Sequence, residues 1–150
     1  MAHTYTSLHF HLVFSTKFRR RWIAPAMEER VWDYLGGIAK QNGMHPHRIG
    51  GVDDHIHAAV SLPPTLTVSK SVQLLKGGSS KWLHDTFPNL REFAWQDGYG
   101  AFSVSRSALP RVVNYIARQR EHHARRTFQE EYLALLRKHD VRYDERYLWG

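Results

Sequence analysis

The sequence has no cysteine among its 150 residues. This absence excludes a disulfide framework, a zinc–thiolate site and a thiol nucleophile, and it favours the reducing cytoplasm as the compartment. There is also no apolar run near the roughly 20 residues that a helix needs to cross a bilayer, so we predict no membrane span. Because internal repeats and low-complexity linkers are absent too, residues 1–150 are expected to form one domain.

Acidic side chains are outnumbered: 14 Asp and Glu stand against 21 Lys and Arg, which gives a net charge of +7. Residues 1–126 hold 17 of the bases and nine of the acids, whereas residues 127–150 hold four bases and five acids. A basic balance of this kind suits a polyanionic partner, most simply nucleic acid. The alternative is a basic surface that only keeps the protein soluble.

Hydrophobic residues alternate with period two in two segments, which predicts strands over residues 5–15 and 55–62. Two further strands are expected over residues 44–50, where Pro46 indicates a sheet edge, and over residues 100–105. One face of the first strand is expected to pack on a core through Leu8, Phe10, Leu12 and Phe14, and the opposite face carries Ser7, His9, His11 and Val13.

Helical periodicity marks four other segments. The second of them contains Gly77 and Gly78, where we expect a break or a bend. Ser107 is expected to cap the third helix, and the spacing of Thr127 and Glu130 is typical of a capping box that begins the fourth. The four segments are residues 25–43, 68–84, 107–125 and 127–138.

The order of these elements is strand, helix, strand, strand, helix, strand, followed by two helices. The first six follow the split β-α-β order of ferredoxin-like folds. We therefore predict an α+β fold with a ferredoxin-like (RRM-like) antiparallel sheet and helices, plus a C-terminal helix that bears a tyrosine, Tyr115.

Three His-x-His pairs are candidates for metal binding, because residues i and i+2 of a strand point to the same side. Each pair by itself also fits an ordinary polar strand face. The pair His55 and His57 differs from the others because Asp53 and Asp54 precede it and the residues between and after it form a wholly apolar opposite face. The other two pairs are His9 with His11 and His45 with His47.

The segment 107–125 carries a second constellation. Tyr115 lies roughly 110° around the helix from the centre of its apolar stripe, and Gln119 follows one turn later. Arg111 and Arg118 share this flank. A boundary tyrosine among solvated arginines would explain the same pattern.

Together these pieces resemble the small HUH transposases of bacterial insertion sequences, which use a single tyrosine and act on single-stranded DNA. The matching motifs occur in order across nearly the whole domain. They are Phe10–Arg20, Asp54–His57, Leu75-Lys76-Gly77 with Ser79-Ser80, Trp95-Gln96-x-Gly98-Tyr99, and Tyr115-Ile116-x-x-Gln119.

The resemblance implies a transposase in which Tyr115 is the nucleophile and His55, His57 and Gln119 hold a divalent metal, Mg²⁺ or Mn²⁺. It implies single-stranded DNA with hairpin ends as substrate, a covalent 5′-phosphotyrosine with a free 3′-hydroxyl, and a homodimer whose active site is shared between the chains. The basic residues expected to contact DNA are Lys17, Arg19, Arg20, Arg21, Lys76, Arg111 and Arg118.

Other functions stay open at this point. A domesticated relative that acts on dispersed hairpin repeats, as REP-associated tyrosine transposases do, would keep the same chemistry. A non-catalytic module could bind single-stranded nucleic acid on a sheet of this order. A metal phosphohydrolase would release its product with no protein-linked DNA.

Overall fold

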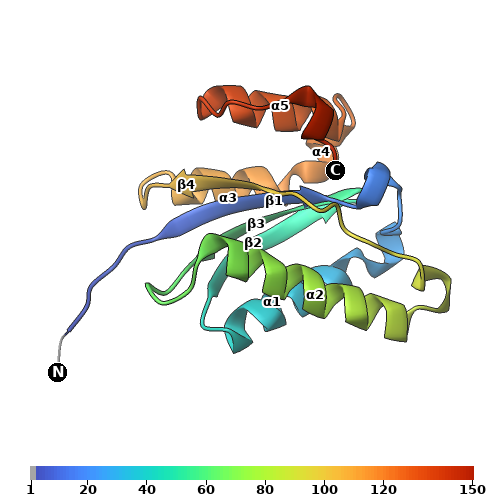
Figure 1. The fold of residues 1–150 in the computed structure, drawn as a ribbon, viewed down its shortest axis with the longest axis horizontal. Helices are drawn as coiled ribbons and strands as arrows, with labels where there is room; N and C mark the ends of the chain where they lie inside the picture. The colour runs from blue at the N-terminus through green and yellow to red at the C-terminus, as the bar shows by residue number, and fades with distance from the viewer. Residues whose placement is uncertain (1–2) are drawn as a thin grey trace.

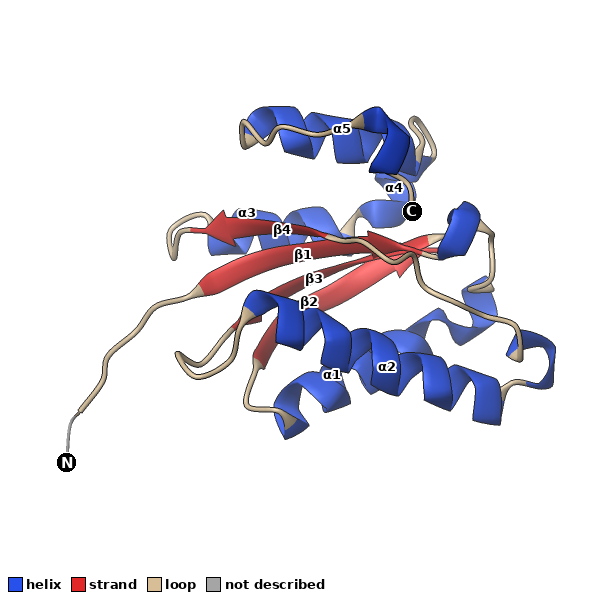
Figure 2. Cartoon of the chain, viewed as in Figure 1, coloured by secondary structure: helices blue, strands red, loops and turns tan. Residues whose placement is uncertain are grey.

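The computed structural model describes residues 3–150. Its centre is a four-stranded antiparallel sheet in the order β2-β3-β1-β4. Helices cover both faces of the sheet (Figures 1 and 2). This arrangement confirms the predicted α+β fold and places β1 and β3 in the middle of the sheet. The strands are β1 (His9–Ser15), β2 (His45–Val52), β3 (His55–Ser61) and β4 (Gly100–Val104).

One face of the sheet packs on α1 (Glu28–Gln41) and α2 (Val68–Thr86), which lie below it in Figure 1. This core contains the predicted inward residues Leu12 and Phe14. The break expected in the second helix is wrong, because α2 runs on through both glycines. Gly78 lies directly against α1, where an added Cβ would be 2.9 Å from Ile38 Cδ1. A glycine here lets the two helices approach closely.

The opposite face is covered by α3 (Leu109–Ala117), α4 (Gln119–His123) and α5 (Phe128–Lys138). The helix α3 lies over β2 and β3. A second apolar cluster joins the sheet to α5, and it contains Val13, Phe102, Phe128, Tyr132 and Leu136. Val13 is therefore fully buried, although the alternation of the first strand placed it on the polar side.

Two predicted boundaries differ from the structure. The first strand begins at His9 instead of residue 5, and the segment 107–125 is two helices that meet at Arg118. Ser107 does not cap α3; the hydroxyl of Ser105 accepts from the Ala108 amide at 3.2 Å. The capping box of Thr127 and Glu130 is confirmed.

The break at Arg118 positions a site residue. The Arg118 amide donates to the Tyr115 carbonyl at 3.2 Å, which tightens the last turn of α3 before α4 begins. Gln119, the first residue of α4, is thereby 1% exposed and reaches the sheet. Across residues 3–150, no helix is both long and apolar enough to cross a membrane.

Candidate active site

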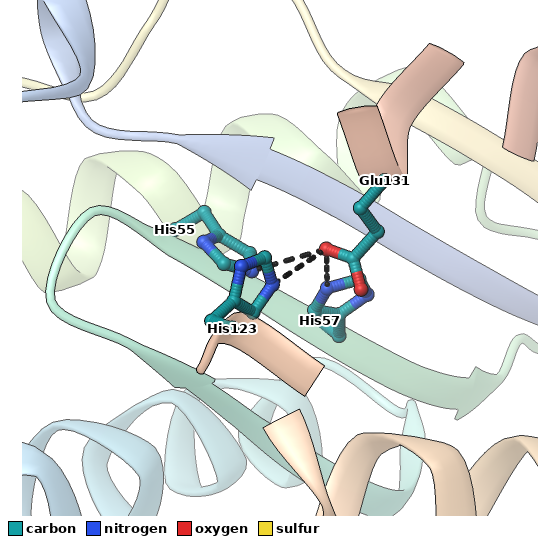
Figure 3. Close-up of side chains that lie close together, drawn as sticks. All are labelled: His55, His57, His123 and Glu131. Carbon is teal, nitrogen blue, oxygen red and sulfur yellow. Dashed lines mark hydrogen bonds and ion pairs between the residues drawn. The ribbon is translucent and has the colours of Figure 1, made fainter. Parts of the chain in front are cut away.

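The histidines of β3 lie at the centre of the covered sheet face. His55 and His57 are both completely buried, and their rings point to the same side of the strand, toward α4 and α5 (Figure 3). The residue before the strand supports the first of them, because Asp54 Oδ1 accepts from His55 Nδ1 at 2.7 Å. Asp54 therefore orients a histidine in addition to ending the β2–β3 turn.

The predicted glutamine and tyrosine reach the same place within one chain. Gln119 Oε1 lies 3.0 Å from His55 Nε2. The ring of Tyr115 is centred 5.8 Å from that of His57, and it is half-buried. The structure thus brings together all four residues that the motifs single out, although they come from β3, α3 and α4.

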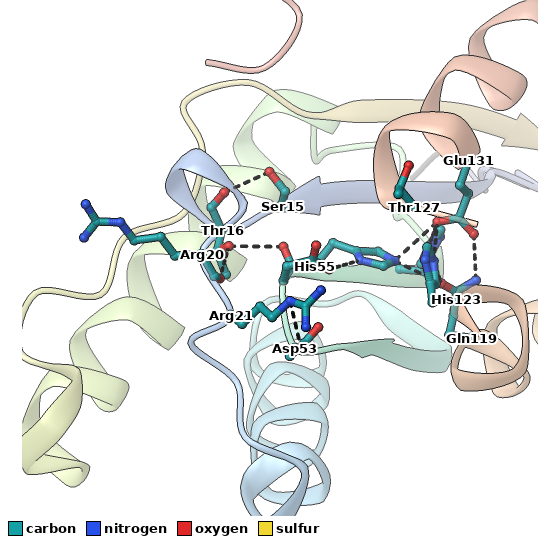
Figure 4. Close-up of polar contacts among 12 residues, drawn as sticks. Ser15, Thr16, Arg20, Arg21, Asp53, His55, Gln119, His123, Thr127 and Glu131 are labelled. Carbon is teal, nitrogen blue, oxygen red and sulfur yellow. Dashed lines mark hydrogen bonds and ion pairs between the residues drawn. The ribbon is translucent and has the colours of Figure 1, made fainter. Parts of the chain in front are cut away.

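Two residues that the sequence did not indicate complete the cluster (Figures 3 and 4). Glu131 of α5 is fully buried, and its Oε1 lies 3.0 Å from His57 Nε2, 3.0 Å from His123 Nε2 and 3.3 Å from His55 Nε2. Its Oε2 accepts hydrogen bonds from the Tyr115 hydroxyl and from Gln119 Nε2. One carboxylate therefore contacts every functional side chain of the site.

A signal for Glu131 did exist in the sequence. Glu131 lies three residues after Phe128 and beside Tyr132, so it falls on the apolar stripe of its helix, where an acid needs a partner. His123 carries no comparable signal. It follows His122 in a polar segment, and only the fold brings it to β3.

Burial and charge shift the pKa values of this cluster in different directions. Burial opposes the charged form of His55, but hydrogen bonds to Asp54 and Glu131 outweigh it and raise the pKa of His55 to about 9. Burial lowers the pKa of His57. Burial would also raise the pKa of Glu131, yet the surrounding imidazoles hold it far below its usual range. The site therefore contains a carboxylate that stays ionised among histidines.

His11 supports the cluster from the neighbouring strand β1. Its Nε2 lies 2.8 Å from His57 Nδ1, and burial together with the His57 charge lowers the pKa of His11 well below its ordinary value. The other histidines of the repeated pairs lie elsewhere. His9 and His47 both contact the Ser61 hydroxyl, each at 2.6 Å, at the opposite end of β3.

The cluster has the composition of a metal site. His55, His57, His123 and Glu131 each offer a ligand atom, and these atoms all lie within 4.8 Å of one another. Three imidazoles and a carboxylate suit a divalent ion of the first transition row, because imidazole is a weak ligand for Mg²⁺. The donor set therefore fits the predicted divalent metal.

A cleft of about 600 Å³ leads to the tyrosine between α3, β4 and α5. Its walls are basic, with Arg111, Arg126 and Lys138. Arg126 Nη2 lies 3.2 Å from the Tyr115 hydroxyl. We expected Arg118 near the hydroxyl from the helix alone, but Arg118 is exposed beyond the end of α3.

The remaining basic residues predicted to bind DNA differ in their surroundings. Lys76 donates to the backbone carbonyls of Gln96 and Gly98, each at 2.7 Å, and so fixes the loop before β4. Lys17 pairs with Asp97 at 3.0 Å. The turn after β1 lies close to the start of β3 and exposes Arg20 and Arg21 (Figure 4). Arg19 in the same turn is half-buried.

A histidine pair on a central strand, with a glutamine and a tyrosine from the covering helices, is the arrangement that the motifs of HUH-type single-tyrosine transposases predict. Comparison with known families agrees with this class. The model of the family described as "Transposase IS200 like" matches residues 4–119, and the chain belongs to this family.

Two curated relatives are similar over most of their length. The chain is 27% identical to the ISDra2 transposase of Deinococcus radiodurans, over 76% of this chain and 85% of that protein. It is 30% identical to the transposase of insertion sequence IS200 from Salmonella typhimurium, over 81% of this chain and 82% of that protein.

Two solved transposase structures have a fold similar to that of this chain. A transposase from Deinococcus radiodurans superposes with a TM-score of 0.65 at 26% identity, covering 79% of this chain and 96% of that one. A REP-associated tyrosine transposase bound to a REP hairpin superposes with a TM-score of 0.60 at 13% identity, over 82% of this chain and 73% of that one. The second likeness shows the fold alone.

Proposed function

We propose that the protein is a metal-dependent transposase that cleaves and rejoins single-stranded DNA through a covalent 5′-phosphotyrosine on Tyr115. The observation that carries the proposal is the position of the Tyr115 hydroxyl, which shares the Glu131 carboxylate with His55 and His57 inside one chain. A plain nucleic-acid-binding module has no need for a tyrosine placed in this way.

His55, His57 and Gln119 are the residues that would hold Mg²⁺ or Mn²⁺, as they do in the family that the motifs indicate. When bound, the ion polarises the scissile phosphate and offsets the negative charge that repels a nucleophile. The buried position of both histidines and the hydrogen bond from His55 to Asp54 keep their rings oriented for this purpose.

Tyr115 supplies the nucleophile. Burial and the Glu131 carboxylate raise the pKa of its phenol, so the hydroxyl keeps its proton at neutral pH and is activated only as it reacts. Its oxygen attacks the phosphorus, the bond from phosphorus to the 3′-oxygen breaks, and the 3′-oxygen takes a proton from water and leaves as a hydroxyl, so that no net proton is released. Glu131 Oε2 holds the Tyr115 hydroxyl through a hydrogen bond, and Arg126 is placed to neutralise the phenolate that forms as the phenolic proton passes to water.

The product conserves the energy of the phosphodiester in the phosphotyrosine bond. A 3′-hydroxyl of a second strand can therefore attack this bond and rejoin the DNA without ATP. Cutting and joining then use the same residues in opposite directions. This reversibility distinguishes a transposase from a hydrolase, which transfers the phosphate to water.

The basic residues Lys17, Arg19, Arg20, Arg21, Lys76, Arg111 and Arg118 are proposed to contact the DNA backbone. Arg111 has the most direct support, because it lines the cleft that contains Tyr115. Lys76 acts at least in part by holding the loop that precedes β4. Hairpin-ended DNA is the proposed partner; the REP-associated relative, which shares the fold, is itself bound to a hairpin.

The motifs also predict a homodimer in which the tyrosine helix of one chain serves the histidines of the other. Within the single chain Tyr115 lies beside its own His57, an arrangement that a site in cis would use directly. A shared site would require α3 and α4 to leave the sheet of their own chain. A site shared between two chains stays a prediction, which mixing two inactive variants would test.

The test is a hairpin-flanked single-stranded oligonucleotide labelled at either end and incubated with the protein and Mn²⁺. We expect the label on the 3′ side of the cut to migrate with the protein on a denaturing gel, and the label on the 5′ side to remain on free DNA with a 3′-hydroxyl. Cleavage without a protein-linked product would indicate a phosphohydrolase. Binding without cleavage would indicate a non-catalytic module.

A further inference from the structure

The family match ends at Gln119, but two residues beyond it reach the centre of the site. His123 lies in α4 and Glu131 in α5; Glu131 Oε1 is 3.3 Å from His55 Nε2, and His123 Nε2 is 3.0 Å from the same oxygen (Figure 4). The ligands that the motifs predict are therefore not the whole set of donor atoms at this point.

The hydrogen bonds around the rings fix which nitrogen carries a proton. His55 Nδ1 faces the Asp54 carboxylate at 2.7 Å, and His123 Nδ1 faces the Arg126 carbonyl at 2.9 Å. Both partners can only accept, so each Nδ1 is the donor. Nε2 is then the ring nitrogen available to a cation, which would replace any proton held there.

The oxygens that these nitrogens face are acceptors too. Gln119 uses its amide nitrogen to donate to Glu131 Oε2 at 3.0 Å, so its Oε1 points inward. That oxygen lies 3.0 Å from His55 Nε2 and 3.0 Å from His123 Nε2. Ring nitrogens of His55, His57 and His123 therefore gather around the Gln119 amide oxygen and the Glu131 carboxylate, and a cation that replaced the protons on these nitrogens could bind all five atoms.

The spacing of the donor atoms agrees with a single ion. Neighbouring donors are separated by 3.0 to 3.3 Å. Imidazole nitrogen and carboxylate oxygen bind divalent ions at about 2.1 Å, so ligands at right angles around such an ion lie about 3 Å apart. Neighbouring donor atoms therefore have the spacing expected for adjacent ligands of one ion.

We propose that His123 and Glu131 join His55, His57 and Gln119 as ligands of the same first-row divalent ion, giving a five-ligand site in place of the three-ligand site of the motifs. This inference rests on the proposed function, whose ion it describes. It follows that three imidazoles favour Mn²⁺ over Mg²⁺, and that a six-coordinate ion keeps one position for a phosphate oxygen.

The proposal also gives Glu131 a positioning role. Its Oε1 faces the ion site while its Oε2 holds the Tyr115 hydroxyl, so one side chain sets the nucleophile relative to the ion. Since Glu131 belongs to α5 and the histidine pair to β3, a bound ion would also fix α5 on the sheet.

The test is Mn²⁺ binding to the full chain without DNA, measured by isothermal titration calorimetry. Glu131→Gln keeps the size of the side chain and should weaken Mn²⁺ binding at least about tenfold, and His123→Ala should do the same. The matched control is Glu121→Gln, because Glu121 is an exposed acid on α4; it should bind as wild type does. Circular dichroism melts verify that each variant is folded.

A second readout separates a ligand from a merely structural residue. Hydrogen exchange of the α5 amides should slow when Mn²⁺ is added to wild type, and should be unchanged by Mn²⁺ in Glu131→Gln. Neither the calorimetry nor the hydrogen-exchange measurement requires catalytic activity.

The outcomes distinguish this inference from the function on which it rests. If His57→Ala loses Mn²⁺ binding while Glu131→Gln and His123→Ala bind as tightly as wild type, the five-ligand site is wrong and the three-ligand site stands. If His57→Ala also binds Mn²⁺ normally, the ion of the proposed function is misplaced and the present inference fails with it.

Discussion

Glu131 is the residue on which the site converges. It places a carboxylate in a fully buried position, which costs stability unless the charge is compensated. Three imidazoles, the Gln119 amide and the Tyr115 hydroxyl supply that compensation. A surface helix rarely buries an acid in this way for packing alone, so the arrangement indicates a functional site.

The first prediction concerns the histidine pair of β3. His57→Ala should abolish adduct formation on hairpin DNA while the core formed by α1 and α2 stays folded and DNA binding persists; because His57 is buried beside Glu131, circular dichroism verifies that the variant is folded. EDTA should have the same effect on wild type, and added Mn²⁺ should restore wild type but not the variant. Full adduct formation in EDTA would contradict the requirement for a metal.

A second prediction separates His11 from His9, which occupy the same face of β1. His11→Ala removes the partner of His57 Nδ1 and should lower the rate of adduct formation about 10- to 100-fold, with weaker Mn²⁺ binding. His9→Ala is the matched control, because His9 contacts Ser61 instead. Equal effects of the two substitutions would mean that His11 does not support the site.

The sequence predicts the local half of this site and misses the distant half. His55 and His57 are aligned by strand geometry alone, and Tyr115 and Gln119 are close in the chain, although a tightened turn at Arg118 lies between them. His123 and Glu131 depend on how α4 and α5 pack over β3; the apolar stripe of α5 indicates that Glu131 is buried, but no periodicity identifies β3 as its partner. The burial of Val13 was missed for the same reason, since α5 had no predicted place on the sheet.

At the scale of elements, the docking of α5 decides whether the site is complete. Tyr132 of α5 lies over Gly100 of β4, where an added Cβ would be 2.8 Å from the Tyr132 ring. Larger residues at this position would push α5, and with it Glu131, away from the histidines. The apolar cluster of Phe128, Tyr132 and Leu136 holds the helix in place.

Gly100→Ala should therefore lower the free energy of unfolding by about 1–3 kcal/mol through overpacking, and should weaken Mn²⁺ binding as well. Gly77→Ala is the control, because its added Cβ meets nothing within 4 Å on the surface of α2 and should stabilise that helix by up to about 1 kcal/mol. Chemical denaturation measures both. A neutral Gly100→Ala would show that α5 adapts without disturbing the site.

The element order was predictable because alternation and helical periodicity persist over several residues each. The division of the third helix was not, since no proline or glycine marks Arg118. A single tightened turn at the end of α3 directs Gln119 inward, where its side chain is buried against the sheet.

At the scale of the whole molecule, the question is whether one chain or two build the site. Mixing His57→Ala with Tyr115→Phe, each inactive alone, distinguishes the two arrangements. If the site forms in cis, every site carries one defect, and adduct formation stays at background even when a tagged pull-down confirms subunit exchange. The distance between Tyr115 and His57 within the chain favours this result.

Recovery of activity would support the shared site instead. With random exchange, half of the protein is heterodimer, and in a shared arrangement one of its two sites has no defect, so about a quarter of the wild-type activity should return. Such a result would mean that α3 and α4 leave the sheet of their own chain in the active form, while the chemistry of the site remains as proposed.

Mass spectrometry of the DNA-linked peptide tests whether Tyr115 is the nucleophile. Wild type is incubated with Mn²⁺ and a hairpin-flanked oligonucleotide, the adduct is digested, and the modified peptide is sequenced by mass spectrometry. We predict a 5′-phosphate on Tyr115, and we predict that Tyr115→Phe still binds the oligonucleotide but forms no adduct. An adduct on another tyrosine such as Tyr99, or cleavage that leaves no protein-linked DNA, would contradict this prediction.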